Sequence, residues 1–248
     1  METPIKTYMN WSGGKDSSLS LFKVLSDKSY SVEALLTNVN AVHNRISMHG
    51  VRRELLTKQA AAIGIPLHTI ELPEQPGMAE YEAAMQAKVS ELKKSGYKTA
   101  VFGDIFLEDL KKYREEKLAL EKMECLFPLW KQDSSRLMDQ FLDLGFKAIV
   151  VCVNSRFLDK SFCGRVINES FVRDLPSDVD ICGENGEYHS FVFDGPIFRY
   201  PVDFNKGKIV KRTYPAPAAT NSSSDPIGSS DPIANRPSAY DFYFCDLI

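Results

Sequence analysis

The chain has 248 residues, of which 44% are hydrophobic and 25% are charged, and its formal net charge is −3. These proportions are ordinary for a soluble globular protein, and the mildly acidic balance lacks the overall basic surface expected of a nucleic-acid-binding protein. No apolar run is long enough for a transmembrane helix and residues 1–6 show no signal-peptide pattern, so we expect a cytoplasmic protein with neither a membrane nor a nucleic acid as its partner.

The first 154 residues alternate between strand-like and helix-like patterns. The hydrophobic pattern predicts strands over 6–10, 32–38, 66–71, 99–102, 124–128 and 147–153. It predicts helices over 17–26, 51–63, 78–95, 110–121 and 134–144. Because strands that alternate with helices favour a parallel sheet covered on both faces, we expect residues 1–154 to form an α/β domain.

The pattern changes after residue 154. A helix is predicted over 168–174, and strand-like segments follow at 188–193, 197–200, 208–214 and 240–248. Residues 215–238 are rich in Pro, Ser, Ala and Asn, a composition that buries little apolar surface and predicts a long flexible loop. We therefore expect residues 155–248 to form a smaller α+β domain with this loop in it.

The cysteines are scattered and form no Cys-x-x-Cys pair, so neither a zinc ribbon nor a redox dithiol is indicated. They are Cys125, Cys152, Cys163, Cys182 and Cys245. Cysteines in apolar surroundings predict buried thiols in a reducing compartment, without a structural metal site.

The most informative motif is a glycine-rich turn that directly follows the first predicted strand. It reads Ser12-Gly13-Gly14-Lys15-Asp16-Ser17. Two adjacent glycines let the backbone turn tightly, and a turn that exposes N–H groups at a helix N-terminus makes an anion site. Lys15 adds a cation for phosphate, whereas the carboxylate of Asp16 indicates a metal ion or a catalytic role. The alternative is an ordinary turn in which a serine or an aspartate caps the helix.

A second candidate site, Gly103-Asp104, follows the strand predicted over 99–102. Ligands of parallel sheets bind at the carboxyl ends of the strands. A carboxylate there suits Mg²⁺ that bridges the phosphates of a nucleotide, so we expect Asp16 and Asp104 to be metal ligands. The alternative is an acidic residue that favours the start of the next helix.

Two further segments carry candidate substrate-binding residues. His49 lies in a loop after the second predicted strand, and binding residues concentrate on loops that a rigid scaffold holds. Residues 183–190 offer acidic, basic and hydrogen-bonding groups at Glu184, Asn185, Glu187 and His189. A plain hairpin connection is the alternative for this segment.

The glycine-rich turn resembles the PP-loop of the ATP pyrophosphatases, which split ATP into AMP and pyrophosphate. Together with Gly-Glu-Asn-Gly-Glu-Tyr-His-Ser-Phe-Val-Phe-Asp-Gly-Pro at 183–196, it makes the chain resemble the diphthine–ammonia ligase family, also described as adenine nucleotide alpha hydrolase-like. The resemblance covers nearly the whole chain except residues 215–238. It implies a HUP-type α/β domain for ATP and a smaller C-terminal domain for the substrate to be amidated.

The resemblance also implies a reaction. It is that of an ATP-dependent amide ligase, which adenylates a carboxylate on a small molecule or a protein and then amidates it with ammonia, using ATP and Mg²⁺. The implied ATP-binding residues are Ser12, Gly13, Gly14, Lys15, Asp16, Ser17, Gly103 and Asp104. The implied catalytic residues are Lys15, Asp16, Glu187 and His189, the last as a proton acceptor. His49, Glu184, Asn185, Glu187 and His189 are expected to face the substrate, and a homodimer is left open.

The substrate itself stays open. Members that amidate diphthine carry a Glu-Tyr-Glu-Thr-like stretch where this chain has Glu187-Tyr188-His189-Ser190. Two other functions are alternatives: a tRNA-modifying PP-loop enzyme and a non-catalytic module that binds adenine nucleotides. The scattered cysteines argue against tRNA thiolation, and Asp16 argues against simple phosphate binding.

Overall fold

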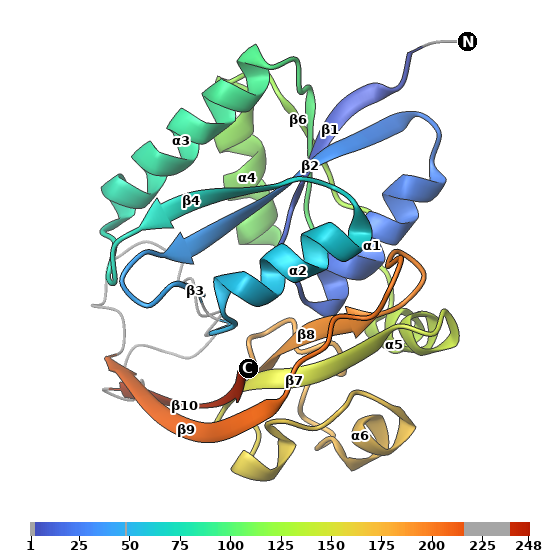
Figure 1. The fold of residues 1–248 in the computed structure, drawn as a ribbon, viewed down its shortest axis with the longest axis vertical. Helices are drawn as coiled ribbons and strands as arrows, with labels where there is room; N and C mark the ends of the chain where they lie inside the picture. The colour runs from blue at the N-terminus through green and yellow to red at the C-terminus, as the bar shows by residue number, and fades with distance from the viewer. Residues whose placement is uncertain (1–2, 48, 216–238) are drawn as a thin grey trace.

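The computed structural model describes residues 3–47, 49–215 and 239–248. It contains two β-sheets, and Figure 1 shows the larger N-terminal sheet with its helices above a smaller sheet that holds the C-terminus. The expected fold class, a parallel sheet with helices on both faces plus a smaller α+β region, is confirmed. No helix in the described ranges is long and apolar enough to cross a membrane.

The first sheet has six strands within the described residues, in the order β3-β2-β1-β5-β6, with β4 also paired to β2. The strands are β1 (Ile5–Asn10), β2 (Tyr30–Asn40), β3 (Arg45–Ile46), β4 (Leu67–Leu72), β5 (Thr99–Val101) and β6 (Glu124–Leu126). All pairings are parallel except the short β2–β3 pairing. Because Met9 of β1 pairs with Val101 of β5, the segments that follow these two strands are neighbours at one edge of the sheet.

Helices cover the two faces of this sheet with separate hydrophobic cores. On one face lie α1 (Lys15–Ser26) and α2 (Arg53–Ile63), whose Leu19, Leu21, Leu55 and Leu56 share a core with Met9. On the other face lie α3 (Met78–Lys94) and α4 (Glu108–Leu120), whose Val89, Leu92 and Leu118 pack with Tyr8. Successive residues of a strand point to opposite faces, which is why Tyr8 and Met9 belong to different cores.

The second sheet is antiparallel, in the order β8-β7-β10-β9. Its strands are β7 (Lys147–Asn154), β8 (Tyr188–Asp194), β9 (Lys206–Pro215) and β10 (Ala239–Leu247). The helix α5 (Ser134–Asp143) precedes it, and the short helices η1 (Lys160–Phe162) and α6 (Glu169–Asp174) lie between β7 and β8 in the chain. Side chains cap all three of these helices: Asp133 accepts from the N–H of Arg136, Asp159 from that of Ser161 and Asn168 from that of Phe171.

The strand expected over 147–153 does not join the parallel sheet, and in this respect our expectation is wrong. β7 lies in the second sheet, between β8 and β10. Every residue of β7 except Lys147 is buried. A continuous apolar run is typical of any strand covered on both faces, so the pattern could not reveal which sheet β7 joins. The division of the chain at residue 154 stays a prediction.

The strand expected over 197–200 is also absent from the structure. Gly195 has a φ of +150°, and the N–H of Phe198 donates to the Gly195 carbonyl at 3.0 Å, which makes a turn. The N–H of Arg199 then donates to the carbonyl of Ala62 at the end of α2, at 2.9 Å. The apolar residues here pack a turn against a helix instead of forming a ladder. The loop expected at 215–238 lies, apart from Pro215, outside the described residues.

The two sheets meet at the segment between β1 and α1. One hydrophobic core runs from α1 and α2 into the second sheet, where it includes Ile149 and Val192. The N–H of Val192 on β8 donates to the carbonyl of Gly13 at 2.9 Å. The glycine-rich turn therefore lies between the two sheets.

Candidate functional site

The glycine turn, residues 12–17, connects β1 to α1 and needs both of its glycines. Gly13 has a φ of +76°, and a Cβ there would lie 2.5 Å from Oε1 of Gln59. A Cβ at Gly14 would lie 3.1 Å from Cε1 of His49 and 3.1 Å from the Ser190 carbonyl oxygen. Gly13 requires the left-handed region of backbone space, and Gly14 requires a close approach of the second domain. Glycine tolerates both best.

Hydrogen bonds within the glycine turn fix its shape. The hydroxyl of Ser12 accepts from the N–H of Gly14 at 3.3 Å and lies 3.1 Å from the hydroxyl of Ser17. Ser17 donates to the Gly14 carbonyl at 2.9 Å. The N–H of Lys15 donates to the hydroxyl of Ser190 on β8 at 3.1 Å, so the second domain holds the N-terminus of α1 directly.

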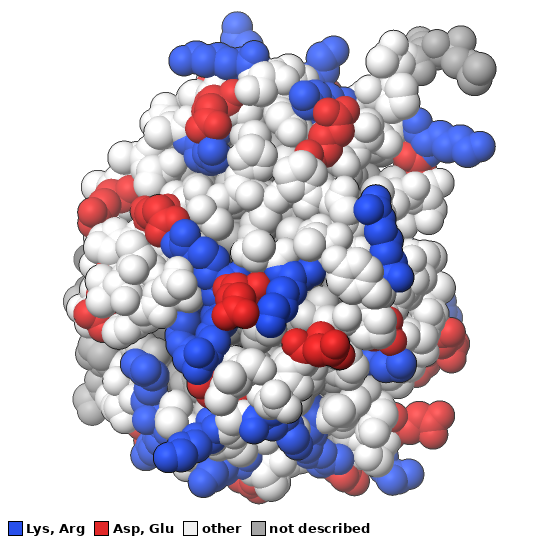
Figure 2. All heavy atoms as spheres, viewed as in Figure 1, with Lys and Arg blue, Asp and Glu red and all other residues white. Residues whose placement is uncertain are grey.

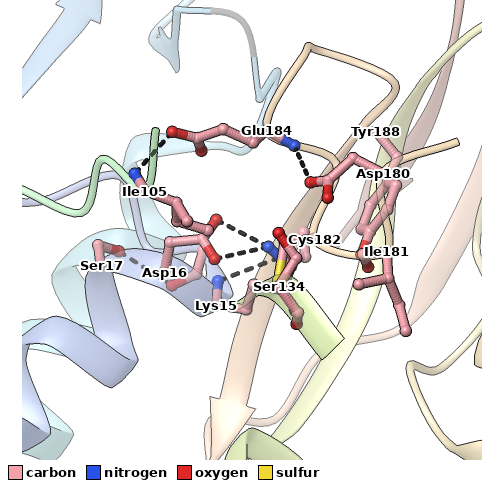
Figure 3. Close-up of polar contacts among 12 residues, drawn as sticks. Lys15, Asp16, Ser17, Ile105, Ser134, Asp180, Ile181, Cys182, Glu184 and Tyr188 are labelled. Carbon is pink, nitrogen blue, oxygen red and sulfur yellow. Dashed lines mark hydrogen bonds and ion pairs between the residues drawn. The ribbon is translucent and has the colours of Figure 1, made fainter. Parts of the chain in front are cut away.

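Lys15 and Asp16 form an ion pair at the start of α1. Lys15 Nζ lies 2.6 Å and 2.8 Å from the two carboxylate oxygens of Asp16, and Lys15 is only 3% exposed (Figure 3). Burial alone would lower the pKa of Lys15, but Asp16 outweighs it and raises that pKa well above its usual value. The ring of Tyr188, with its centroid 5.7 Å from Nζ, adds a cation–π contact. Lys15 is therefore a permanent cation at this end of the helix.

Glu184 of the second domain reaches across to the first. Its Oε1 accepts from the N–H of Ile105 at 2.7 Å, and its own N–H donates to Asp180 at 2.9 Å, as Figure 3 shows. Burial raises the pKa of Glu184 to about 8, and the nearby carboxylates of Asp16 and Asp104 push it in the same direction. The side chain thus lies in a region of negative charge between the domains.

Asp104 follows β5 as expected, but it already has a cationic partner. Its Oδ1 accepts from Nη2 of Arg114 at 3.1 Å, and its Oδ2 lies 3.0 Å from Arg114 Nε. The preceding Gly103 packs under α1, because a Cβ there would lie 3.1 Å from the carbonyl carbon of Asp16. Within the described residues, no three His, Cys, Asp or Glu side chains are grouped as a metal site.

Glu187 is buried, with 1% exposure, and only one of its two carboxylate oxygens has hydrogen-bond partners among the described residues. Its Oε1 accepts from the N–H of Asp180 at 3.0 Å and from the amide of Asn185 at 3.1 Å. Its Oε2 is buried and has no hydrogen-bond partner in the described part of the chain. An unpaired buried carboxylate oxygen is costly, so this atom calls for a donor from a ligand or a water molecule.

His189 and His49 meet beside the glycine turn. Their rings lie 4.6 Å apart, and Nδ1 of His49 donates to the carbonyl of Ser190 at 3.2 Å. Burial lowers the pKa of His49 to about 4 and that of His189 well below its usual value, and Lys15 contributes in both cases. Both rings are therefore neutral at pH 7. Nε2 of His189 is a second buried atom without a partner among the described residues.

The structure thus brings the predicted residues together in two neighbouring groups. Lys15, Asp16 and Glu184 form one group, and His49 and His189 form the other beside Gly14. Cys182 lies next to the first group, but burial raises the pKa of its thiol to about 12, which argues against a thiolate nucleophile.

Sequence reasoning missed several residues that support the site. Gln59 on α2 donates to the carbonyls of Gly13 and Val192 and accepts from the indole N–H of Trp11. It is fully buried, and a polar residue within the apolar stripe of a helix was a signal that could have found it. Ser190 acts through a contact with Lys15, which is distant in sequence, so the one-dimensional pattern carried no comparable signal for it. Asp180 and Arg114 contact residues nearer in the chain, but no hydrophobic or motif pattern singles them out.

The fold and the site define a class of protein: an α/β protein whose glycine turn, at the carboxyl edge of a parallel sheet, is closed by a segment of a smaller second domain. Comparison with family models matches residues 5–122 to the diphthamide synthase N-terminal domain and residues 133–214 to the diphthamide synthase C-terminal domain. The chain belongs to the diphthamide synthase family. The second match includes β7, in agreement with the sheet that this strand joins.

Curated relatives carry a common name, diphthine–ammonia ligase. The protein from Danio rerio is 27% identical over 215 residues, which cover 77% of this chain and 83% of that protein. The protein from Bos taurus is 25% identical over 116 residues, which cover 44% of this chain and 43% of the relative. The protein from Homo sapiens is 24% identical over 110 residues, which cover 42% of this chain and 41% of the relative.

Proposed function

We propose that this protein is an ATP-dependent amide ligase that joins ammonia to a carboxylate, as the name of its relatives describes for diphthine. The observation that carries the proposal is the glycine turn at the carboxyl edge of the sheet, beside which His189 of the second domain, in contact with His49, keeps a buried Nε2 without a partner among the described residues. A ligase needs a phosphate site beside a second-substrate site, and these are the two chemistries that lie side by side here. The carboxylate belongs to a small molecule or to a protein.

The glycine turn fits the phosphates of ATP. Bare backbone at Gly13 and Gly14 lets the turn pack closely against Gln59, His49 and Ser190 and keeps its shape fixed. The N-terminus of α1 directs N–H groups and the positive end of its dipole to the same place. Lys15 is charged and positioned to stabilise the negative charge that develops on the leaving pyrophosphate.

Mg²⁺ fits the carboxylates of Asp16 and Asp104, but the two residues differ in how readily they could hold it. Asp16 would hold the ion by sharing its oxygens between the metal and the adjacent Lys15. Asp104 would first have to release Arg114. The absence of a three-residue metal group in the described chain is compatible with Mg²⁺, which usually takes one or two carboxylates and completes its shell with phosphates and water. When bound, the ion would neutralise phosphate charge.

The unpartnered atoms support a role for Glu187 and His189 toward the second substrate. His189 is the second residue of β8, and Glu187 comes directly before that strand. Because His189 is neutral and a weak base, we assign it to orienting ammonia through Nε2 instead of storing its proton. Glu184, with a pKa of about 8, is the stronger base of the two, and its ionised form can accept the proton.

The proposed reaction has two steps. A substrate carboxylate oxygen attacks the α-phosphorus of ATP and pyrophosphate leaves, which gives an acyl-adenylate. Ammonia then attacks the acyl carbon, one proton of the attacking nitrogen passes to ionised Glu184, and AMP leaves with the former carboxylate oxygen. His49 and Asn185 complete the wall around the second substrate, since His49 contacts the ring of His189 and Asn185 holds Glu187.

Product analysis tests this proposal. The protein is incubated with ATP, Mg²⁺, ammonium and pools of carboxylate metabolites, and nucleotides and phosphates are separated. We expect AMP and pyrophosphate, with repeated turnover only when ammonium and one carboxylate are both present. ADP and phosphate as the only products would contradict the proposal. ATP binding without turnover in any pool would favour a nucleotide-binding module.

A further inference from the structure

The turn that carries His49 is tied to the last strand of the chain. Asp246 on β10 accepts from Nη2 of Arg45 at 2.8 Å, and from Nη2 and Nε of Arg52 at 2.6 Å and 3.2 Å. The Asp246 side chain is 23% exposed, and the hydrogen bond from Arg52 is the main cause that lowers its pKa. Two guanidiniums on one half-buried carboxylate make this contact stronger than an ordinary surface ion pair. Figure 2 shows Lys and Arg side chains beside Asp and Glu side chains on the face of the molecule that it draws.

Arg45 carries the connection into the backbone of the turn. While its Nη2 donates to Asp246, its Nη1 donates to the carbonyl of Gly50 at 2.7 Å. Gly50 has a φ of +68°, and a Cβ there would lie 2.7 Å from Cδ1 of Phe244. Phe244 and Asp246 both belong to β10, so this strand holds Gly50 by packing and, through Arg45, by charge.

The other side of the same turn touches the candidate site. His49 packs against Gly14, and its Nδ1 donates to the Ser190 carbonyl. Because a neutral imidazole has one donor and one acceptor, this bond makes Nε2 of His49 an acceptor. The chain of contacts therefore runs from Asp246 through Arg45 and Gly50 to His49 and ends at the glycine turn.

We propose that Asp246 is a positioning residue, which uses Arg45 and Arg52 to hold the His49–Gly50 turn against the glycine turn. The consequence is that the second domain closes a wall of a site whose phosphate-binding loop belongs to the first. Asp246 acts through His49 and does not touch the reacting atoms. Its effect on turnover rests on the proposed function, whereas its effect on the turn does not.

Nitrogen NMR of the histidine rings in the full-length protein tests this proposal. The chain has only four histidines, so the His49 signals can be assigned by substitution. In the parent protein, His49 should carry its proton on Nδ1 alone. In Asp246→Asn, the turn should open part of the time, so His49 should show both tautomers. ATP affinity should then fall about tenfold, the effect of one charged hydrogen bond.

Two further variants separate positioning from general stability. Glu71→Gln removes another carboxylate beside the same turn, the partner of Arg53, and should leave the His49 tautomer and ATP affinity unchanged. Arg45→Lys keeps a charge for Asp246 but cannot donate to it and to Gly50 in the same way, so it should reproduce the mixed tautomers. Arg45→Lys also replaces Asp246→Asn in this test if the Asp246→Asn protein does not fold.

The outcomes are distinct. A folded Asp246→Asn protein with one His49 tautomer and parental ATP affinity would overturn the proposal, as would mixed tautomers in Glu71→Gln. Recovery of the single tautomer in Asp246→Glu would support it. If the parent protein binds no ATP, the proposed function fails, while the His49 tautomer still decides whether Asp246 positions the turn.

Discussion

The glycine turn and β8 lie against each other, yet they satisfy their polar groups in different ways. The turn is held by its own hydroxyls, by Gln59 and by the ion pair between Lys15 and Asp16. At the start of β8, His189 and the preceding Glu187 each keep one buried atom without a partner in the described residues. For the proposed function, this difference means that the turn is preformed, whereas the second-substrate side is completed only by a ligand.

The largest effect should come from removing the charge of the turn. We expect Lys15→Met to lower turnover by at least roughly a hundredfold, because a preorganised charge at the leaving group is lost. Lys23→Met is the matched control, since Lys23 lies on the same helix and contacts only the exposed Gln132 among the bonds described for it. Initial rates of pyrophosphate release measure the effect. Equal rates in the two variants would remove Lys15 from the reaction.

A pair of glycine variants separates backbone strain from close packing. Gly13→Ala and Gly145→Ala change residues with φ of +76° and +78°, but a Cβ at Gly145 meets nothing within 4 Å. Both should lose about 1 kcal/mol to the left-handed conformation. Gly13→Ala should lose about 1–3 kcal/mol more, because its Cβ overlaps Gln59. Urea unfolding measures both values, and equal losses would mean that Gln59 yields freely.

The sequence predicts the glycine turn better than it predicts the place and contacts of β7 and β8. Local chemistry revealed the glycine turn, because Gly13 and Gly14 follow an apolar strand at a strand-to-helix junction. The alternation of strands and helices likewise predicted the first sheet. The place of β7 and the contacts of Ser190 depend on which strands pair over long distances, and a buried apolar run carries no information on its partner.

The pH dependence of the unfolding free energy tests the raised pKa of Glu184, which lies between the two regions. Its pKa is raised from 4.5 to about 8 in the folded protein, so the folded state binds more protons and stability falls as the pH rises through this interval. His49 acts in the opposite direction, but only between about 4 and 6.5. From pH 6.5 to 8 we therefore expect a loss of up to about 2 kcal/mol.

Glu184→Gln should abolish this loss, because the amide does not titrate while its oxygen can still accept from Ile105. Unfolding free energies of both proteins at several pH values between 6.5 and 8 give the comparison. A slope that persists in Glu184→Gln would mean that another group titrates in this range.

The smallest effect concerns the single hydroxyl that joins the two regions. Ser190→Ala removes the acceptor of the Lys15 N–H and should cost about 1 kcal/mol of stability. Ser190→Thr keeps the hydroxyl and should retain most of that stability, which thermal unfolding of the two variants can measure. A greater loss in Ser190→Thr than in Ser190→Ala would show that close packing at this position matters more than the hydrogen bond.

The most direct test of the division between the two regions is ATP calorimetry on the double variant Glu187→Gln, His189→Ala, with pyrophosphate release measured on the same sample. We predict an ATP affinity within about fourfold of the parent, together with loss of substrate-dependent release, because these groups act only on the second substrate. A folded variant that no longer binds ATP would contradict the account, since Glu187 and His189 would then belong to the nucleotide site.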